Sequence, residues 1–289
     1  MKSMRHFLLI SIIICCYSFD TAAQSPVANP GKAPRPLVLG EIHEIQSALL
    51  GEKRVLNIYL PEGYNDTTRY AVTFLLDGSM DEDFIHVAGL YQFNQFEWVN
   101  RVPKTILVGI ATVDRRRDFT FPTNIETDKK AYPSSGKSAN FIAFIEKELQ
   151  PYIEQRFKTT SSKTIIGQSL GGLLATEILL RHPSLFSQYI IISPSLWWND
   201  GSLLMHTSVL LQPDFSAKTA VYIGVGKEGL TPGDKPRVME VDANLLAEKI
   251  KSGKSKALKV FFDYLPQKDH ATIAHQAIYN ALLLLNPSQ

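Results

Sequence analysis

Long apolar runs that alternate with amphipathic segments constrain the fold of this chain more than any other feature of its sequence. Six runs are almost continuously apolar, as in strands covered on both faces: YAVTFLLDG, KTILVGIAT, KTIIGQS, SQYIIISPS, TAVYIGVG and KALKVFFDYL. An earlier pair, GEIHEIQSALL and KRVLNIYLP, alternates apolar and polar residues like a half-buried antiparallel hairpin with its turn at 50–52. The sequence therefore predicts eight strands.

Four segments between or after the later runs have the period of amphipathic helices. They are SANFIAFIEKELQPYIEQRF, LGGLLATEILLRH, VMEVDANLLAEKIKSG and HATIAHQAIYNALLLL. Because buried strands that alternate with helices form parallel sheets, we expect an α/β fold with a mostly parallel eight-stranded sheet and helices on both faces. With 289 residues, 45% of them hydrophobic, the chain can bury one large core, so residues 41–289 are expected to form a single domain. Trp98, in an earlier helix-like segment, is expected to be structural.

The first residues have the pattern of an export signal. A basic start precedes the apolar run FLLISIIICCYSF and the small residues of DTAAQ, so residues 1–23 are predicted to be a signal peptide. The alternative is a retained N-terminal anchor, but the apolar run is too short to span a bilayer comfortably. We therefore expect a periplasmic or secreted protein without stable membrane insertion after cleavage. Residues 24–40, rich in Pro and Gly, are expected to form a linker.

Cleavage of the signal would limit the chemistry of the mature chain. Both cysteines, Cys15 and Cys16, lie within the signal, so no thiol would remain for catalysis, disulfides or metal thiolate sites. The mature chain would have 28 basic and 27 acidic side chains, compared with 30 and 28 in the whole chain. This balance gives no indication of a nucleic-acid partner.

One motif lies where a strand-like run ends and a helical segment begins. Gly167, Ser169 and Gly171 form GxSxG at this junction. A serine at such a sharp turn is strained, with its Oγ exposed, and glycines two residues away on either side relieve crowding against the strand and the helix. Gly172 would let the helix pack closely. The context predicts a nucleophile elbow in which the amide of Leu170 binds a developing oxyanion.

A serine hydroxyl needs a base, and one histidine stands where that base is expected. In this arrangement the chain order is serine, acid, histidine, with the histidine just beyond the last strand. His270 follows the run at 256–265 and begins the terminal helical segment. His275 is its rival among the seven histidines, but it lies a turn further into the helix, where a partly buried structural role is expected.

The acid that would orient this histidine is expected just after the run at 219–226. Glu228 is the first carboxylate there and would hold the imidazole in the correct tautomer. Asp234 is the alternative if the loop folds back, and a site without a strong third member is another. Asp242 is expected to belong to the following helix, and Asp269 to cap the last one.

A second oxyanion donor is expected from the loop in FLLDGSMDEDF. Because Gly78 allows close approach of the backbone, the amide of Gly78 or of Ser79 is the candidate. The alternative is that Asp77 and Gly78 only form a turn.

These segments together resemble a known family. YLPEGY, FLLDG, VGIATVDRRRDFTFP, IIGQSLGG, IISPSLWW and KDHATIAHQAI follow one another as in the predicted esterases of the α/β-hydrolase superfamily, close to the enterochelin (siderophore trilactone) esterase and esterase D group. The resemblance covers nearly all of residues 41–285. It implies an α/β-hydrolase fold and a serine esterase in which Ser169 and His270 carry the chemistry. It also implies that the DRRRDF and SPSLWW loops line the substrate cleft.

These two loops contain the candidate substrate-binding residues. Residues 114–137 show no helical or strand period, and such long loops tend to be functional or disordered. Arg115 and Arg117 could offer bidentate donors to a carboxylate, catecholate or phosphate. Alternatively, they could pair with Asp114, Asp118 or Glu126 and only fix the loop. Trp197 and Trp198 could form an apolar wall of the cleft, with core packing of one of them equally open.

The residues therefore predict two-step acyl transfer to water, which requires no metal or organic cofactor. The expected substrate is a small-molecule or glycan ester, such as a siderophore lactone or the acyl groups of a polysaccharide. The alternatives are an acyltransferase that uses the same serine and histidine, and a non-catalytic binding protein that keeps the fold. The ester itself and the oligomeric state are not defined by the sequence.

Overall fold

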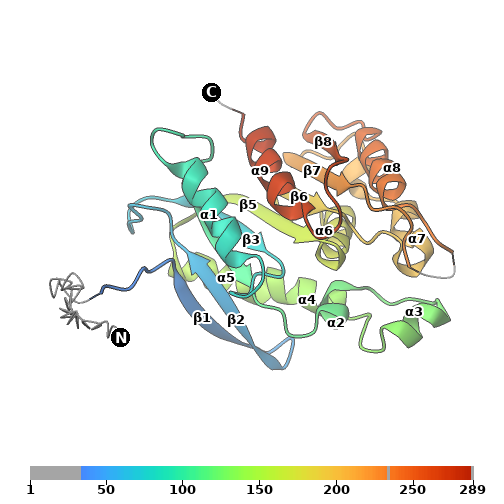
Figure 1. Ribbon diagram of the computed structural model, residues 1–289, viewed down its shortest axis with the longest axis horizontal. Helices are drawn as coiled ribbons and strands as arrows, with labels where there is room; N and C mark the ends of the chain where they lie inside the picture. Colours follow the sequence, from blue (N-terminus) through green and yellow to red (C-terminus); the bar gives the residue numbers. More distant parts are fainter. Residues whose placement is uncertain (1–33, 233–234, 288–289) are drawn as a thin grey trace, which may run out of the picture. The chain divides into compact units, whose positions relative to one another are not determined.

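The structure, a computed structural model, describes residues 34–232 and 235–287 (Figure 1). The predicted signal peptide, most of the predicted linker and Asp234 lie outside the described residues. Residues 34–38 are exposed and have no regular secondary structure. From Leu39 onward the chain forms one compact unit.

An eight-stranded sheet forms the centre of this unit, with the strand order β1-β2-β4-β3-β5-β6-β7-β8. The strands from β4 to β8 in this order are parallel to one another, whereas β2 pairs antiparallel with both β1 and β4. The predicted eight strands and mostly parallel sheet are therefore confirmed. The strands are β1 (Glu41–Ser47), β2 (Glu52–Tyr59), β3 (Tyr70–Leu75), β4 (Thr105–Ile110), β5 (Thr159–Gln168), β6 (Gln188–Ile192), β7 (Thr219–Gly226) and β8 (Leu258–Leu265).

Burial along the strands follows the sequence pattern from which they were predicted, except in β8. Every residue of β4 is buried, because this central strand is covered on both faces. In contrast, β1 lies at the edge of the sheet and exposes most of its residues, in keeping with its alternating pattern. Strand β8 lies at the other edge of the sheet and has no fully buried residue, so the expectation that it is covered on both faces is wrong.

Helices cover both faces of the sheet (Figure 1). On one face, α1 and α9 pack in a cluster with strand residues such as Leu75, Ile166 and Ile190. On the other, α4, α5, α6 and α8 pack in a second cluster around strand residues such as Phe74 and Ile165. The helices are α1 (Phe84–Gln95), α2 (Arg115–Phe119), α3 (Glu126–Ala131), α4 (Ser138–Phe144), the π-helical turn η1 (Ile145–Leu149), α5 (Gln150–Arg156), α6 (Leu170–Arg181), α7 (Trp198–Met205), the 3₁₀ turn η2 (Val209–Leu211), α8 (Met239–Lys251) and α9 (Ile273–Leu285). In the described part of the chain, none of these helices is long and apolar enough to cross a membrane.

The segment 114–137 differs from the expectation of a loop without regular structure. It contains α2 and α3, of five and six residues, which are too short to produce a recognisable period in the sequence. Asp114 begins α2 as an N-cap, because its side chain accepts a hydrogen bond from the amide of Arg117 at 3.0 Å. Local capping therefore accounts for the start of α2.

Candidate active site

Ser169 occupies a strained turn between β5 and α6. Its φ of 59° and ψ of −118° lie outside the regions that a residue with a side chain usually adopts. Its amide donates to the carbonyl of Ile192 at 3.0 Å, so the turn is tied to the end of β6. The predicted strand-to-helix turn around the serine is therefore present.

The glycines around this serine differ in how much they are needed. A Cβ at Gly167 would lie 2.3 Å from the carbonyl oxygen of Gly171, and one at Gly172 would lie 2.8 Å from that of Ile192. A Cβ at Gly171 would meet nothing closer than 3.4 Å, which is an ordinary contact. Crowding therefore requires glycine at positions 167 and 172. The sequence suggested that position 171 also requires glycine for steric reasons, and this is wrong.

Replacing Gly167 with alanine is expected to lower the free energy of unfolding by about 1–3 kcal/mol, the usual cost of overpacking a close contact. The matched change Gly171→Ala is expected to alter it by less than about 1 kcal/mol, because the new methyl group has room and alanine suits a helix better than glycine. Urea unfolding followed by circular dichroism measures both values. Equal losses for the two variants would contradict the steric argument.

His270 and Glu228 form a close pair at the same edge of the sheet. His270 lies in the turn between β8 and α9, and Glu228 follows the end of β7. The imidazole Nδ1 is 2.6 Å from the Glu228 Oε2. The other oxygen, Oε1, accepts hydrogen bonds from the Ser193 hydroxyl and from the amide of Gly226, the latter at 3.2 Å. The carboxylate is therefore fully engaged, and its side chain is only 3% exposed.

The environment of Glu228 keeps it charged. Burial raises the pKa of Glu228, but the hydrogen bonds with His270 and Ser193 lower it by more than burial raises it. The pKa therefore lies below the ordinary value for glutamate. An ionised carboxylate at the Nδ1 position holds a proton on that nitrogen and leaves Nε2 as the proton acceptor.

Ser169 and His270 lie at the same edge of the sheet, and no direct hydrogen bond joins them in the described part of the chain. The side-chain amide of Gln168, the residue before the serine, donates to the carbonyl of His270 at 2.6 Å. The Ser169 Oγ is 3.3 Å from the Ser195 Oγ, and within the described residues no hydrogen bond joins it to the imidazole. Catalytic hydrogen bonds of this kind are often long before substrate binds.

Two serines of the turn after β6 contact this group, and the sequence analysis did not identify them. Ser193 donates to Glu228, and Ser195 lies against the Oγ of Ser169. Ser193 has a φ of 42° and is completely buried, and its amide donates to the carbonyl of Gly224 at 2.8 Å. The signal that could have found them is the sequence Ser-Pro-Ser directly after the strand that neighbours the nucleophile strand.

The amides proposed for the oxyanion hole have different surroundings. Leu170 is the first residue of α6, where backbone amides have no partner within the helix. The Gly78 amide already donates to the carbonyl of Ile110 at 3.0 Å, so it is not free for a substrate. No hydrogen bond of the Ser79 amide is found in the described part of the chain. Of the two predicted amides, the geometry therefore favours Ser79.

The arginines of α2 have partners within the protein. The Arg115 Nε lies 2.9 and 3.0 Å from the two carboxylate oxygens of Asp77, and its Nη2 donates to the carbonyl of Gln168 at 3.0 Å. Arg117 pairs with Asp118 at 2.8 Å and with Glu52. Both guanidinium groups are therefore held by carboxylates. Of the three partners expected in the alternative, only Asp118 is used, and Asp77 and Glu52 take the place of Asp114 and Glu126.

Trp198 does not line a cleft. It is completely buried, and its indole nitrogen donates to the carbonyl of Phe121 at 2.8 Å, so the prediction of ligand contact is wrong for this residue. Trp197 is partly buried and packs against the same core cluster, 6.1 Å from the ring of Tyr132. One of the two tryptophans is therefore a core residue, and only Trp197 keeps an exposed surface.

The competing residues lie elsewhere. His275 is on α9, with its ring 5.1 Å from that of His86. Asp242 is on α8 and pairs with Arg237 at 2.7 Å. Asp269 accepts hydrogen bonds from two backbone amides of the turn before α9. The N-cap of α9 is Thr272 and carries no side-chain cap, so Asp269 closes this turn and does not cap the helix as expected. Asp234 lies outside the described residues, so its position is not compared.

Comparison with known sequences gives a consistent set of relatives. Residues 47–271 match the family described as "Putative esterase". Over 170 residues the chain is 32% identical to the ferri-bacillibactin esterase BesA of Bacillus subtilis, an alignment that covers 54% of this chain and 59% of that protein. The chain therefore spans less than two thirds of this relative's length.

Solved structures of similar fold include proteins from two bacteria. An IroE-like serine hydrolase from Shewanella oneidensis is 30% identical with a TM-score of 0.74, and the match covers 86% of this chain and 80% of that one. The BES protein from Bacillus cereus is 26% identical with a TM-score of 0.75, covering 88% and 98%. The sheet and helices described above thus have the α/β-hydrolase type of fold.

Proposed function

The chain belongs to the esterase family whose description is "Putative esterase", and from this we propose that it hydrolyses carboxylic esters through an acyl-enzyme on Ser169. The observation that carries the proposal is the hydrogen-bonded pair of His270 and Glu228 at the edge of the sheet where Ser169 occupies a strained turn. Gln168, the residue before this serine, bonds directly to His270. A serine hydroxyl alone is a weak nucleophile, and a histidine oriented by a carboxylate is the group that activates it.

In the proposed first step, His270 Nε2 takes the proton of the Ser169 hydroxyl while Oγ attacks the ester carbonyl carbon. The amide of Leu170, together with that of Ser79, would bind the negative oxygen that develops. The tetrahedral intermediate then collapses, the bond to the alcohol oxygen breaks, and His270 returns the proton to the leaving alcohol. Ser169 is left as an ester of the acyl group.

In the proposed second step, water takes the place of the alcohol. His270 removes a proton from the water as its oxygen attacks the acyl carbon, and then returns that proton to Ser169 Oγ as the acid product leaves. Glu228 stays ionised throughout and stabilises the imidazolium that forms in each half of the reaction. Its lowered pKa fits this role, because the carboxylate does not take up a proton near neutral pH.

The substrate class that we propose is a small-molecule siderophore ester. This rests on the relatives, because BesA is named as a ferri-bacillibactin esterase. A polysaccharide acyl ester is not favoured by any contact in the described site. Arg115 and Arg117 could have bound an anionic substrate, but they form ion pairs with Asp77, Asp118 and Glu52. They therefore do not support this proposal.

We expect the purified protein to open a catecholate trilactone by addition of water, with kcat/KM of about 10⁴ M⁻¹s⁻¹ or more. Mass spectrometry of the products measures this for the iron-free and iron-loaded trilactone, beside p-nitrophenyl butyrate. Added methanol or glycerol reports acyl transfer, because a transferase would form the corresponding ester. Hydrolysis of the simple ester with an intact trilactone would contradict the siderophore proposal while leaving a general esterase.

We also propose that the protein is exported, with cleavage after residue 23. The basis is the pattern of the first residues, a basic start followed by an apolar run and small residues. Edman sequencing or mass spectrometry of protein recovered from the cell envelope or medium tests the cleavage site.

A further inference from the structure

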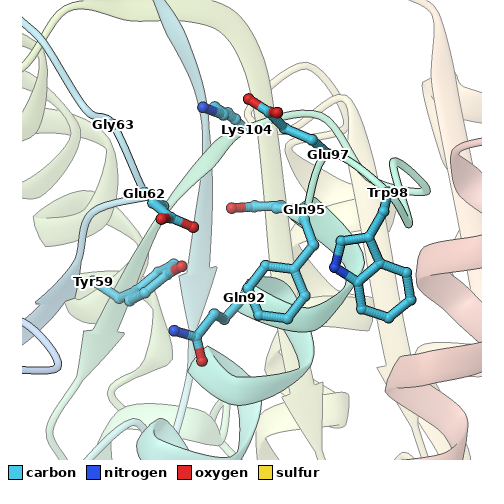
Figure 2. A pocket seen from close by; sticks show the side chains of 9 residues that line it. Tyr59, Glu62, Gly63, Gln92, Gln95, Glu97, Trp98 and Lys104 are labelled. Atoms are coloured by element: carbon cyan, nitrogen blue, oxygen red, sulfur yellow. The ribbon is translucent and has the colours of Figure 1, made fainter.

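Figure 2 shows a cavity beside α1. It lies at the edge of the sheet where β4 begins, opposite the edge at which β5 ends and Ser169 follows. It forms where the end of α1 meets the end of β2 and the chain that enters β4, and its volume is about 500 Å³. That volume is in the range of small-molecule sites. Because α1 starts after the active-edge loop of β3 and its twelve residues span about 18 Å, the cavity is separate from the catalytic serine.

An exposed tryptophan forms one wall of this cavity. Trp98 is 78% exposed, so the expectation that it is structural is wrong. Its ring is nevertheless held in place, because it stacks on Phe96 with a centroid distance of 5.9 Å and an angle of 17° and meets the edge of Phe93 at 5.9 Å. The turn that carries it is closed by the amide of Asn100, which donates to the carbonyl of Phe96 at 2.7 Å. The indole is thus a fixed aromatic surface that faces solvent.

Gln95 places an unpaired acceptor in the same cavity. Its side-chain nitrogen donates to the carbonyl of Pro103 at 3.2 Å, which orients the amide, and the residue is only 9% exposed. Its Oε1 has no hydrogen-bond partner among the described residues. Figure 2 shows this oxygen pointing toward the space between α1 and Glu62. An unpaired buried acceptor costs about 1–3 kcal/mol. A ligand hydroxyl that moves the surrounding side chains aside and donates to the Gln95 Oε1 would remove this cost, so binding of such a ligand is favoured.

The other polar groups around the cavity are free and of mixed character. Figure 2 shows the Glu62 carboxylate and the Trp98 indole nitrogen directed toward the middle of the cavity from opposite sides. Within the described chain, these two groups and the side chains of Gln92, Glu97 and Lys104 form no hydrogen bond or ion pair. The cavity therefore offers donors and acceptors together, with charges of both signs at its rim.

This combination is suited to a neutral ligand with many hydroxyl groups. A hydroxyl both donates and accepts, so a ring that carries several can satisfy carboxylate, amide and indole groups at once. The C–H face of such a ring can cover an aromatic surface and remove it from water. We propose that this cavity binds a sugar, as a single pyranose unit or as one unit of a glycan. The proposal does not depend on the activity of Ser169.

The test uses a panel of sugars as probes: N-acetylglucosamine, methyl glucoside, methyl galactoside, maltotriose and chitotriose. Saturation-transfer difference NMR and tryptophan fluorescence are expected to show binding of at least one probe with a Kd in the millimolar range or tighter. Fluorescence reports this site, because Trp98 is the strongly exposed tryptophan whereas Trp198 is completely buried. Binding of no probe would overturn the proposal.

Two variants locate the binding. Trp98→Ala and Gln95→Met are each expected to weaken it at least about tenfold, whereas the matched control Met205→Ala, which removes another exposed apolar side chain on α7, leaves it unchanged. Hydrolysis of p-nitrophenyl butyrate and thermal unfolding are measured on all of them, so that a folding defect is recognised. If Gln95→Met does not fold, the binding measured for Trp98→Ala alone tests the location of the sugar site. Binding that survives Trp98→Ala would place the sugar elsewhere and overturn the proposal.

Discussion

Replacement of Ser169 with alanine is expected to lower kcat for ester hydrolysis about a million-fold, the size of effect seen when the nucleophile of a serine triad is removed. The reason is that, among the described residues, Ser169 is the serine at the junction of β5 and α6, where the adjacent Gln168 contacts His270. Ser195 lies closest, with its Oγ 3.3 Å from that of Ser169, but its amide is tied to the Ser169 carbonyl at 3.0 Å and it lies at a different turn. Steady-state kinetics with p-nitrophenyl butyrate measures the loss.

Ser195→Ala is the matched control for this experiment. It removes a hydroxyl from the same site, and kcat is expected to stay within about tenfold of the original value, the scale of one neutral hydrogen bond. A fluorophosphonate probe followed by peptide mapping should label Ser169 in the original protein and in Ser195→Ala but not in Ser169→Ala. Labelling of another serine, or an active Ser169→Ala variant, would end the esterase assignment for this site.

The second large effect is expected for Glu228→Gln, with a loss of about 10⁴ in kcat, because an amide at this position favours the wrong tautomer of His270 while keeping the geometry. Stability should also change with pH. The folded-state pKa of Glu228 is lowered, so the charged carboxylate stabilises the fold above the pKa of an unfolded glutamate, and this contribution disappears as the pH falls through the lower folded value. Urea unfolding of both proteins across the acidic range measures this difference.

Ser193→Ala provides the comparison for Glu228→Gln. It removes one hydrogen bond to the carboxylate but leaves the charge and the contact with the histidine, so a loss of only about tenfold is expected. Ser193 would then be a positioning residue that acts through Glu228. Near-normal activity of Glu228→Gln would show instead that the site works without this acid and would return attention to Asp234.

The fold could be predicted from the sequence because the inner strands of the sheet are largely buried on both faces. Such strands are apolar throughout, and the alternation of these runs with helices leaves few topologies. The same topology predicted that Ser169, Glu228 and His270 lie at one edge of the sheet, since each follows the carboxyl end of a parallel strand. Their placement therefore depended on strand order rather than on side-chain detail.

Side-chain partners were harder to predict, because they depend on packing between segments that are distant in the sequence. Nothing near Arg115 in the chain indicates that it pairs with Asp77, and the neighbouring Trp197 and Trp198 look alike although only the second is fully buried. Trp98 was misjudged for the same reason, since its exposure results from the way the turn after α1 folds back. Sequence period describes faces of elements, and these residues lie in turns or at the first position of a short helix, where no face is defined.

The Ser-Pro-Ser turn after β6 has a consequence for motion within the site. The amide of Ser169 donates to the carbonyl of Ile192, and the amide of Ser195 donates to the carbonyl of Ser169. The amide of Ser193 donates to the carbonyl of Gly224. These hydrogen bonds connect the ends of β5, β6 and β7. We therefore expect the ends of these three strands to move together. The spacing between Ser169 and Glu228 is therefore expected to change little when the surrounding helices move.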